Sequence, residues 1–349
     1  MKHSKIFMTK FIKLCDMSSA AQPLTNIKTR GQRMCRVADA LLKAHHDQAN
    51  TSSALTTTTP ETSSIRVVCI SDTHNKQPTV PLGDILIHAG DLTENGSFEE
   101  VQHGLTWLSS QPHKYKIFVA GNHDVLLDDV FLENYPERRY GQRKTKHDLD
   151  WGSVIYLQDS FITLEIPASQ QKQERHMEKV VEVQPRRSIT IFGSPWTPRY
   201  GISAFQYHPN NSQHWEDTFA SLDRKPHIVV THGPPHLHLD RRDFHRAGCP
   251  YLAEEIYRIR PRLSVFGHIH ASYGREDVLL DSVHKMHEDV IRGWVGWGGI
   301  VWMATIVLWA RVKHIFRGPE ADTSVTFVNA AVVGGPHNEL QNAPIIVDL

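Results

Sequence analysis

The sequence predicts an α/β fold, and three observations carry this prediction. First, short apolar runs typical of buried strands recur along the chain from residue 65 onward. Second, segments with the spacing of amphipathic helices alternate with these runs. Third, the strands end in Asp, Asn or His, and open α/β folds place their chemistry in the turns that follow such strand ends. One pattern therefore predicts both the fold class and the place of the functional site.

Five of the apolar runs are followed directly by polar motifs. The runs span 65–70, 85–88, 116–120, 227–230 and 263–266. The motifs that follow are Asp72-Thr73-His74, Gly90-Asp91, Gly121-Asn122-His123-Asp124, Thr231-His232-Gly233 and Gly267-His268-Ile269-His270. Between the second and third runs, Ser97 and Glu100 have the spacing of a capping box. They predict the start of a helix with Val101, Leu105 and Leu108 on its apolar face.

The residue types in these turns favour a site for two divalent metal ions. Asp, Asn and His together suit Mn, Fe or Zn, and no cysteine lies in any of the five motifs. One carboxylate can bridge two ions about 3.5–4 Å apart, and such a pair supplies a hydroxide at neutral pH and holds a phosphoryl group. Two ions, two aspartates and one hydroxide leave a net positive charge, which favours a phosphate anion.

In this order, the five motifs resemble those of the calcineurin-like metallophosphoesterase superfamily. Segments 88–93, 192–196, 231–235, 325–330 and 344–348 resemble its metallophosphoesterase-domain-containing subgroup, which is related to class III cyclic nucleotide phosphodiesterases. The resemblance covers residues 65–349 apart from two insertions. It implies a four-layer α/β fold, a β-sandwich of two sheets flanked by helices, with a dinuclear metal site at the carboxyl ends of the strands.

The resemblance also implies a role for each polar residue of the motifs. Asp72, His74 and His270 would bind the first metal, and Asn122, His232 and His268 the second. Asp91 would bridge the two ions. His123 would protonate the leaving oxygen, and Asp124 would orient His123 and favour its protonated form. Trp196 and Arg199 follow the strand 189–192, on the same rim of the fold as the metal motifs. There they could contact a base or a phosphate of the substrate, or they could pack against the rim.

The expected function is hydrolysis of a phosphodiester or phosphomonoester by a metal-bridging hydroxide, with a small cyclic nucleotide as the first choice of substrate. One alternative is a phosphomonoesterase similar to protein phosphatases. A second is a non-catalytic scaffold that binds a membrane or a protein through a Trp-rich insertion. The complete ligand set and His123 favour the enzyme.

The amino-acid composition limits which binding partners and which cellular compartment are expected for the protein. The 349 residues carry a formal net charge of zero, so no chain-wide basic surface predicts specific nucleic-acid binding. Four dispersed cysteines predict no disulfide framework and agree with a reducing, cytoplasmic environment.

Residues 1–64 read as a disordered tail, basic at first and then rich in Ser and Thr. A mitochondrial presequence or a surface-binding helix is the alternative for the basic part. Residues 65–349 form the expected catalytic domain, which a polar insertion at 168–187 and an apolar insertion at about 276–320 interrupt.

The second insertion is unusual because Gly293–Ala310 contains four tryptophans and no charged residue. A single membrane crossing would separate the last strands from the metal site, so it is not expected. The alternatives are an interfacial helix, a re-entrant hairpin broken at Gly296, Gly298 and Gly299, self-association, a lid over the site, or a helix packed on the domain.

Overall fold

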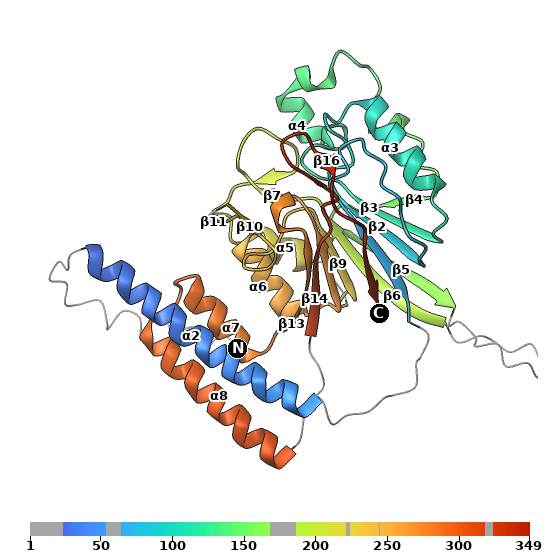
Figure 1. The fold of residues 1–349 in the computed structure, drawn as a ribbon. Coiled ribbons are helices and arrows are strands. Elements are labelled where there is room, and N and C mark those ends of the chain that lie inside the picture. The colour runs from blue at the N-terminus through green and yellow to red at the C-terminus, as the bar shows by residue number, and fades with distance from the viewer. Residues whose placement is uncertain (1–23, 54–63, 168–185, 221–223, 244, 318–323) are drawn as a thin grey trace, which may run out of the picture. The chain divides into compact units, whose positions relative to one another are not determined.

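The computed structural model describes residues 24–53, 64–167, 186–220, 224–243, 245–317 and 324–349 (Figure 1). The chain divides into two compact units. The helical unit comprises Met1–Thr58 and Asp281–Ala321, and the α/β unit comprises Thr59–Leu280 and Asp322–Leu349. The expected polar insertion lies outside the described residues except for Arg186 and Arg187, which begin a strand.

The first sheet of the α/β unit contains five strands, four of them parallel. The last strand of the chain joins it at one edge and runs antiparallel to its neighbour. In spatial order the strands are β17 (Ile345–Asp348), β1 (Arg66–Ile70), β2 (Ile85–Ala89), β3 (Tyr115–Val119) and β4 (Val154–Tyr156). Parallel strands end at the same edge, so the motifs after β1, β2 and β3 lie side by side.

The second sheet contains six strands, with parallel strands at its centre and antiparallel pairs at both edges. In spatial order the strands are β13 (Gly274–Leu279), β14 (Ser324–Asn329), β12 (Leu263–Phe266), β9 (Ile228–Thr231), β6 (Arg186–Ser194) and β5 (Ser160–Pro167). The motifs after β9 and β12 follow neighbouring central strands.

The two sheets pack face to face, and helices cover their outer faces. Alternate residues of β1 show this, because Val67 and Cys69 belong to the core shared by both sheets, whereas Val68 and Ile70 belong to the core that contains the helix residues. The helices of the first sheet are α3 (Phe98–Ser110) and α4 (Asp129–Asn134), and those of the second are α5 (His214–Ala220) and α6 (Pro250–Ile259). The predicted four-layer α/β fold is confirmed.

The capping box predicted for α3 is present, with Ser97 and Glu100 each bonded to the backbone of the other. Short elements complete the unit. The strand pairs are β7 (Thr197–Pro198) with β8 (Gln206–Tyr207), β10 (Arg241–Arg242) with β11 (His245–Arg246), and β15 (Val333–Gly334) with β16 (Glu339–Leu340). The 3-10 turns are η1 (Val125–Leu127), η2 (Pro136–Arg139), η3 (Lys146–Asp148) and η4 (His270–Ser272).

The helical unit consists of α2 (Leu24–Ser53), α7 (Ser282–Ile291) and α8 (Trp297–Arg317). Its core contains Ala38 of α2, Val283 and Val290 of α7, and Ile300, Met303 and Val307 of α8. Part of the expected disordered tail is therefore helical. The reason is the helical spacing of Met34, Ala38, Leu41 and Leu42, which pack in this core.

The apolar insertion begins later than expected, because β13 continues to Leu279, which pairs with Ser324 of β14. The alternative of a re-entrant hairpin broken at glycines is not what the structure contains, because α8 is one helix. Gly296 precedes the helix, and Gly298 and Gly299 lie in its first turn. Among the described residues, we find no helix with the length and apolarity that a bilayer crossing requires.

Candidate metal centre

The turns after the strands hold their polar residues in an uncommon backbone conformation. Asp72, His74, Asp91 and His268 all have a positive φ, at 53°, 44°, 53° and 67°. Residues other than glycine rarely adopt this conformation, which costs energy and is concentrated at functional sites. This conformation occurs in three of the five motif turns, and other loops of the described chain, such as those at Tyr140 and Leu237, share it.

Two glycines of the motifs leave room for the aspartates. A side-chain Cβ on Gly267 would lie 2.0 Å from Asp72 Oδ2, and one on Gly121 would lie 2.3 Å from Asp91 Oδ1. No side chain fits at such distances, so these positions require glycine for close approach.

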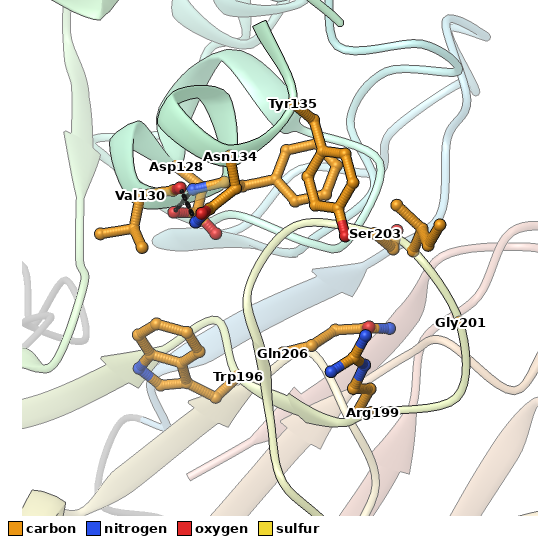
Figure 2. Close-up of a pocket in the computed structure, with 11 residues that line it drawn as sticks. Asp128, Val130, Asn134, Tyr135, Trp196, Arg199, Gly201, Ser203 and Gln206 are labelled. Carbon is orange, nitrogen blue, oxygen red and sulfur yellow. Dashed lines mark hydrogen bonds between the residues drawn. The ribbon is translucent and has the colours of Figure 1, made fainter.

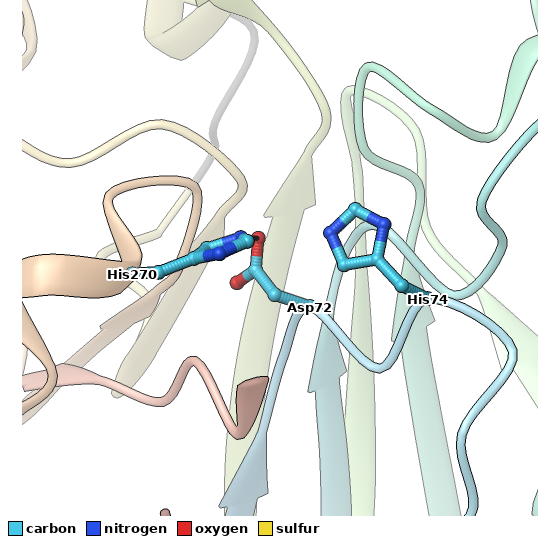
Figure 3. A group of neighbouring side chains, drawn as sticks. All are labelled: Asp72, His74 and His270. Carbon is cyan, nitrogen blue, oxygen red and sulfur yellow. Dashed lines mark hydrogen bonds and ion pairs between the residues drawn. The ribbon is translucent and has the colours of Figure 1, made fainter. Parts of the chain in front are cut away.

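The first group of expected ligands consists of Asp72, His74 and His270. Their ligand atoms lie within 4.8 Å of one another (Figure 3). Asp72 is fully buried at the end of β1, and its Oδ1 lies 3.2 Å from His270 Nε2. Both carboxylate oxygens also accept a hydrogen bond from the backbone N–H of His268 at 3.0 Å. Asp72 therefore joins the two sheets at this end of the sandwich.

The second group consists of Asp91, His232 and His268, again with ligand atoms within 4.8 Å of one another. Asn122 adjoins it, because Asn122 Oδ1 lies 3.0 Å from His232 Nε2. His232 is fully buried, and its Nδ1 donates to the carbonyl oxygen of Ala89 at 3.0 Å. This bond turns Nε2 toward the centre, the usual arrangement of a metal-binding histidine.

Asp91 lies between the two groups. Its Oδ2 is 3.8 Å from His74 Nε2 of the first group and 3.3 Å from His232 Nε2 of the second. Its Oδ1 accepts the backbone N–H of His123 at 2.8 Å, so the carboxylate is fixed in orientation. This is the geometry expected of a bridging ligand.

The donors fit a pair of divalent ions. His74 Nε2 is buried and makes no hydrogen bond to any residue that the structure describes. Burial lowers the pKa of His74 and lowers that of His268 to about 3, so both rings are neutral and free to bind a metal. Burial raises the pKa of Asp91, but the charges of His232 and His123 outweigh burial and hold the pKa well below its usual value.

His123 belongs to neither of these two groups, but it forms a third group of possible ligands with His74 and Glu94, again with ligand atoms within 4.8 Å of one another. Its ring lies edge-on to His74 with centroids 4.8 Å apart, and its Nδ1 donates to the carbonyl oxygen of Glu94 at 2.6 Å. Nε2 is thus available to a substrate. Burial lowers the pKa of His123, but Asp91 and the Glu94 carbonyl raise it by more, so the net pKa lies above the ordinary value.

Asp124 makes its hydrogen bonds to the turns after β2 and β3. Its carboxylate is fully buried and accepts hydrogen bonds from the backbone of Gly121, Leu92 and Thr93 and from the Thr93 hydroxyl. The Glu94 carbonyl holds the His123 ring, and the charge of Asp124 is among the causes that raise the pKa of His123. Asp124 fixes the turn after β2 against the turn after β3.

Glu94 is the residue that the sequence reasoning missed. Its carboxylate Oε2 lies 3.2 Å from His74 Nδ1 and accepts a hydrogen bond from Asn338 Nδ2 at 3.0 Å. Its carbonyl oxygen holds His123. The one signal in the sequence is its position three residues after Asp91 in the same turn.

The expected ligands open into a cavity of about 770 Å³. His74, Asp91, Asn122, His123, His268 and His270 line it together with Tyr200, Arg242 and Tyr273. Tyr200 is 55% exposed and lies against His268 with ring centroids 5.2 Å apart. A cavity of this size accepts a small molecule.

Trp196 and Arg199 line a neighbouring cavity of about 540 Å³ instead. Figure 2 shows Trp196, Arg199 and Gln206 facing Asn134 and Tyr135 across this cavity. The Trp196 indole donates to Asp159 Oδ2 at 2.8 Å, which fixes the ring. The segment between Arg199 and Phe205 borders both cavities, and Ser203 Oγ donates to the Asn122 carbonyl at 2.8 Å.

The sequence of the chain is similar to that of a known family and of several known proteins. The sequence model of the calcineurin-like phosphoesterase family matches residues 65–272. A protein of Emericella nidulans, named probable rhamnogalacturonate lyase C, is 39% identical over 288 residues, which cover 82% of this chain and 24% of that protein. A UPF0046 protein of Caenorhabditis elegans is 33% identical over 215 residues, or 60% of this chain and 65% of that protein.

Metallophosphoesterase domain-containing protein 1 of Homo sapiens is 34% identical over 226 residues, which cover 60% of this chain and 61% of the human protein. The chain therefore spans less than two thirds of each of these three relatives and only about a quarter of the fungal one.

Proposed function

Because the chain belongs to the calcineurin-like phosphoesterase family, whose domain implies a phosphoester hydrolase, we propose that it hydrolyses a small phosphodiester, with a cyclic nucleotide as the preferred class. The observation that carries the proposal is the position of Asp91 Oδ2, within 3.8 Å of His74 Nε2 and 3.3 Å of His232 Nε2, on the wall of an open cavity.

The seven expected ligands would hold two divalent ions, with Asp91 between them. Two ions held here would activate water for attack and offset the charge that develops on the phosphoryl group. The side chains of the protein would provide the remaining parts of the chemistry. The neutral rings of His74 and His268 keep the site positively charged overall and so favour an anionic substrate.

His123 would supply the proton that the leaving oxygen needs. Its Nδ1 is held by the Glu94 carbonyl, so the second ring nitrogen faces the cavity that His123 lines. Asp91 raises the pKa of His123 against the opposing effect of burial, which favours the protonated ring. A group placed in this way acts as a general acid when the ester bond breaks.

The cavity supports the choice of a nucleotide. Tyr200 and Tyr273 offer aromatic faces on which a base can stack, and Arg242 offers a cation for a phosphate oxygen. An aromatic platform at the rim suits a compact ligand with a planar ring.

The test compares substrates on protein loaded with Mn²⁺. We expect turnover of bis(p-nitrophenyl) phosphate and of 2′,3′- or 3′,5′-cyclic nucleotides, with slower turnover of p-nitrophenyl phosphate and of phosphopeptides. Tyr200→Ala should raise KM for the cyclic nucleotide about tenfold and leave KM for a phosphodiester without an aromatic ring, such as glycerophosphocholine, unchanged.

Tyr140→Ala serves as the matched control, because Tyr140 is 48% exposed, similar to Tyr200, and does not line this cavity. Turnover of phosphopeptides alone would assign the protein to the phosphatases. No turnover of any phosphoester by protein that binds two metal ions would favour a non-catalytic scaffold.

A further inference from the structure

The helix α8 exposes a continuous apolar stripe. Six large apolar side chains form it: Trp297, Val301, Trp302, Leu308, Trp309 and Val312, with exposures of 39%, 66%, 56%, 62%, 66% and 37%. Each residue of an α-helix is rotated by about 100° about the helix axis relative to the one before it. On this basis the six side chains lie within an arc of about 140° around the axis. Thr305, the one polar side chain in this arc, bonds its hydroxyl to the Val301 carbonyl. The stripe therefore presents no unsatisfied polar group.

The opposite side of α8 is already occupied within the helical unit. Ile300, Met303 and Val307 are at most 5% exposed and pack with residues of α2 and α7. The stripe is thus not needed for the core of this unit. Large exposed apolar patches of this kind mark sites of interaction.

The charges around the stripe identify its partner. Between Trp297 and Lys313 the ionisable side chains are Arg311 and Lys313, and both are basic. By the helical spacing, Arg311 and Lys313 lie on opposite sides of the stripe near its end. Tryptophan in an apolar face bordered by basic residues is typical of helices that lie in the surface of an anionic membrane.

A second copy of the chain fits the stripe less well. From Trp297 to Val312 the helix rises about 22 Å, and a face about 10 Å wide gives roughly 200–300 Å². A stable protein interface buries about 800 Å² per partner. The stripe alone is too small for a stable dimer, whereas an interfacial helix needs only one face.

We propose that α8 attaches the protein to a membrane surface rich in anionic lipids, with the stripe lying among the lipid headgroups and Arg311 and Lys313 contacting their phosphates or carboxylates. The helix lies parallel to the membrane, in agreement with the finding that no described helix can span a bilayer. Attachment of this kind is independent of the reaction at the metal centre.

The test is flotation of the full-length protein with two kinds of vesicle. One contains phosphatidylcholine and phosphatidylserine in equal amounts, and the other contains phosphatidylcholine alone. The wild type should float with the anionic vesicles, and binding should fall as salt rises. Trp302→Ser with Trp309→Ser should weaken binding at least about tenfold, because the loss of one buried aromatic side chain already corresponds to about that factor.

Two further variants separate charge from apolar contact. Arg311→Gln with Lys313→Gln should weaken binding to anionic vesicles about fivefold for each charge removed. Val37→Ser with Leu82→Ser, which removes exposed apolar side chains outside α8, should bind like the wild type. All three variants should hydrolyse a soluble diester at the wild-type rate.

Three results would overturn the proposal. The first is failure of the wild type to float with either kind of vesicle. The Trp302→Ser, Trp309→Ser variant could turn a dimeric wild type into a monomer without any vesicle binding, which would identify the stripe as a contact between copies. The same variant could lower the melting temperature by several degrees, which would show that the stripe packs within the chain.

Discussion

In the α/β unit, polar side chains are buried at the ends of apolar strands, whereas in the helical unit large apolar side chains are exposed on one helix. Asp72 and His232 are fully buried, and Trp302 and Trp309 are more than half exposed. Each arrangement is costly unless something binds. Buried carboxylates and imidazoles need ions or hydrogen bonds, and an exposed aromatic stripe needs a lipid or protein surface. The comparison teaches that the two units differ in what they offer a binding partner: the α/β unit offers buried polar groups, and the helical unit offers an exposed apolar face.

The first test of this comparison is Asp91→Asn, for which we expect the largest effect. The substitution removes the charge that the two groups share, so both ions should be bound more weakly and hydrolysis should nearly stop. Changes to residues around a metal ligand cost about 10–100-fold, and a bridging ligand should cost more. Metal content and the turnover of bis(p-nitrophenyl) phosphate measure the effect.

Asp217→Asn is a matched control, because Asp217 is exposed on α5. A variant of Asp91 that bound two ions and turned over at the wild-type rate would refute the bridging role. Vesicle binding through α8 should be unaffected by either substitution, because Asp91 and Asp217 lie in the α/β unit and the stripe lies in the helical unit.

The second test is His123→Ala, which should keep both ions and lower the rate by roughly 10²–10⁴-fold, as expected for a lost general acid. The loss should be smaller for nitrophenyl esters than for alkyl esters, because a good leaving group needs less protonation. His103→Ala, an exposed histidine on α3, is the control. Equal losses on both kinds of ester would argue against proton donation, and loss of metal would make His123 a ligand.

The third test is Glu94→Gln, with a smaller expected effect. The amide keeps the size of the side chain but weakens the hold on His74 Nδ1, so affinity for the first ion should fall about 10–100-fold. Excess metal should restore most of the rate, since His123 is held by the Glu94 carbonyl, which the substitution leaves in place. Glu133→Gln on α4 is the exposed control. If excess metal left the rate low, Glu94 would act on the reaction itself.

The sequence predicted the parts of the site that strand ends bring together. Asp72, Asp91 and His232 each follow an apolar run, and parallel strands place such residues at one edge of a sheet. Glu94 could not be assigned in this way, because its carboxylate meets His74 only through the shape of the turn and through Asn338 from the end of the chain.

The helical unit was predicted less well, for a different physical reason. α2 is stabilised by contacts with residues more than 240 positions later, such as Val283 and Met303. The sequence near α2 does not indicate which distant residues α2 packs against. The Ser and Thr residues that follow α2 suggested disorder. The Trp-rich composition of α8 was visible in the sequence, but its exposed and buried faces required the packing of the three helices.

The last test removes the helical unit and should have the smallest effect on chemistry. Leu279 of β13 pairs directly with Ser324 of β14, so a tight turn can replace Asp281–Thr323 without moving either strand. A chain that starts at residue 59 and carries this turn loses all of α2, α7 and α8. It should keep two metal ions at the metal centre and hydrolyse a soluble diester within about twofold of the wild-type rate, because none of the seven expected ligands and no residue lining their cavity is removed. It should also fail to float with anionic vesicles. A folded variant that binds metal but has lost its activity would show that the helices act on the metal centre, and the two units would then share one function.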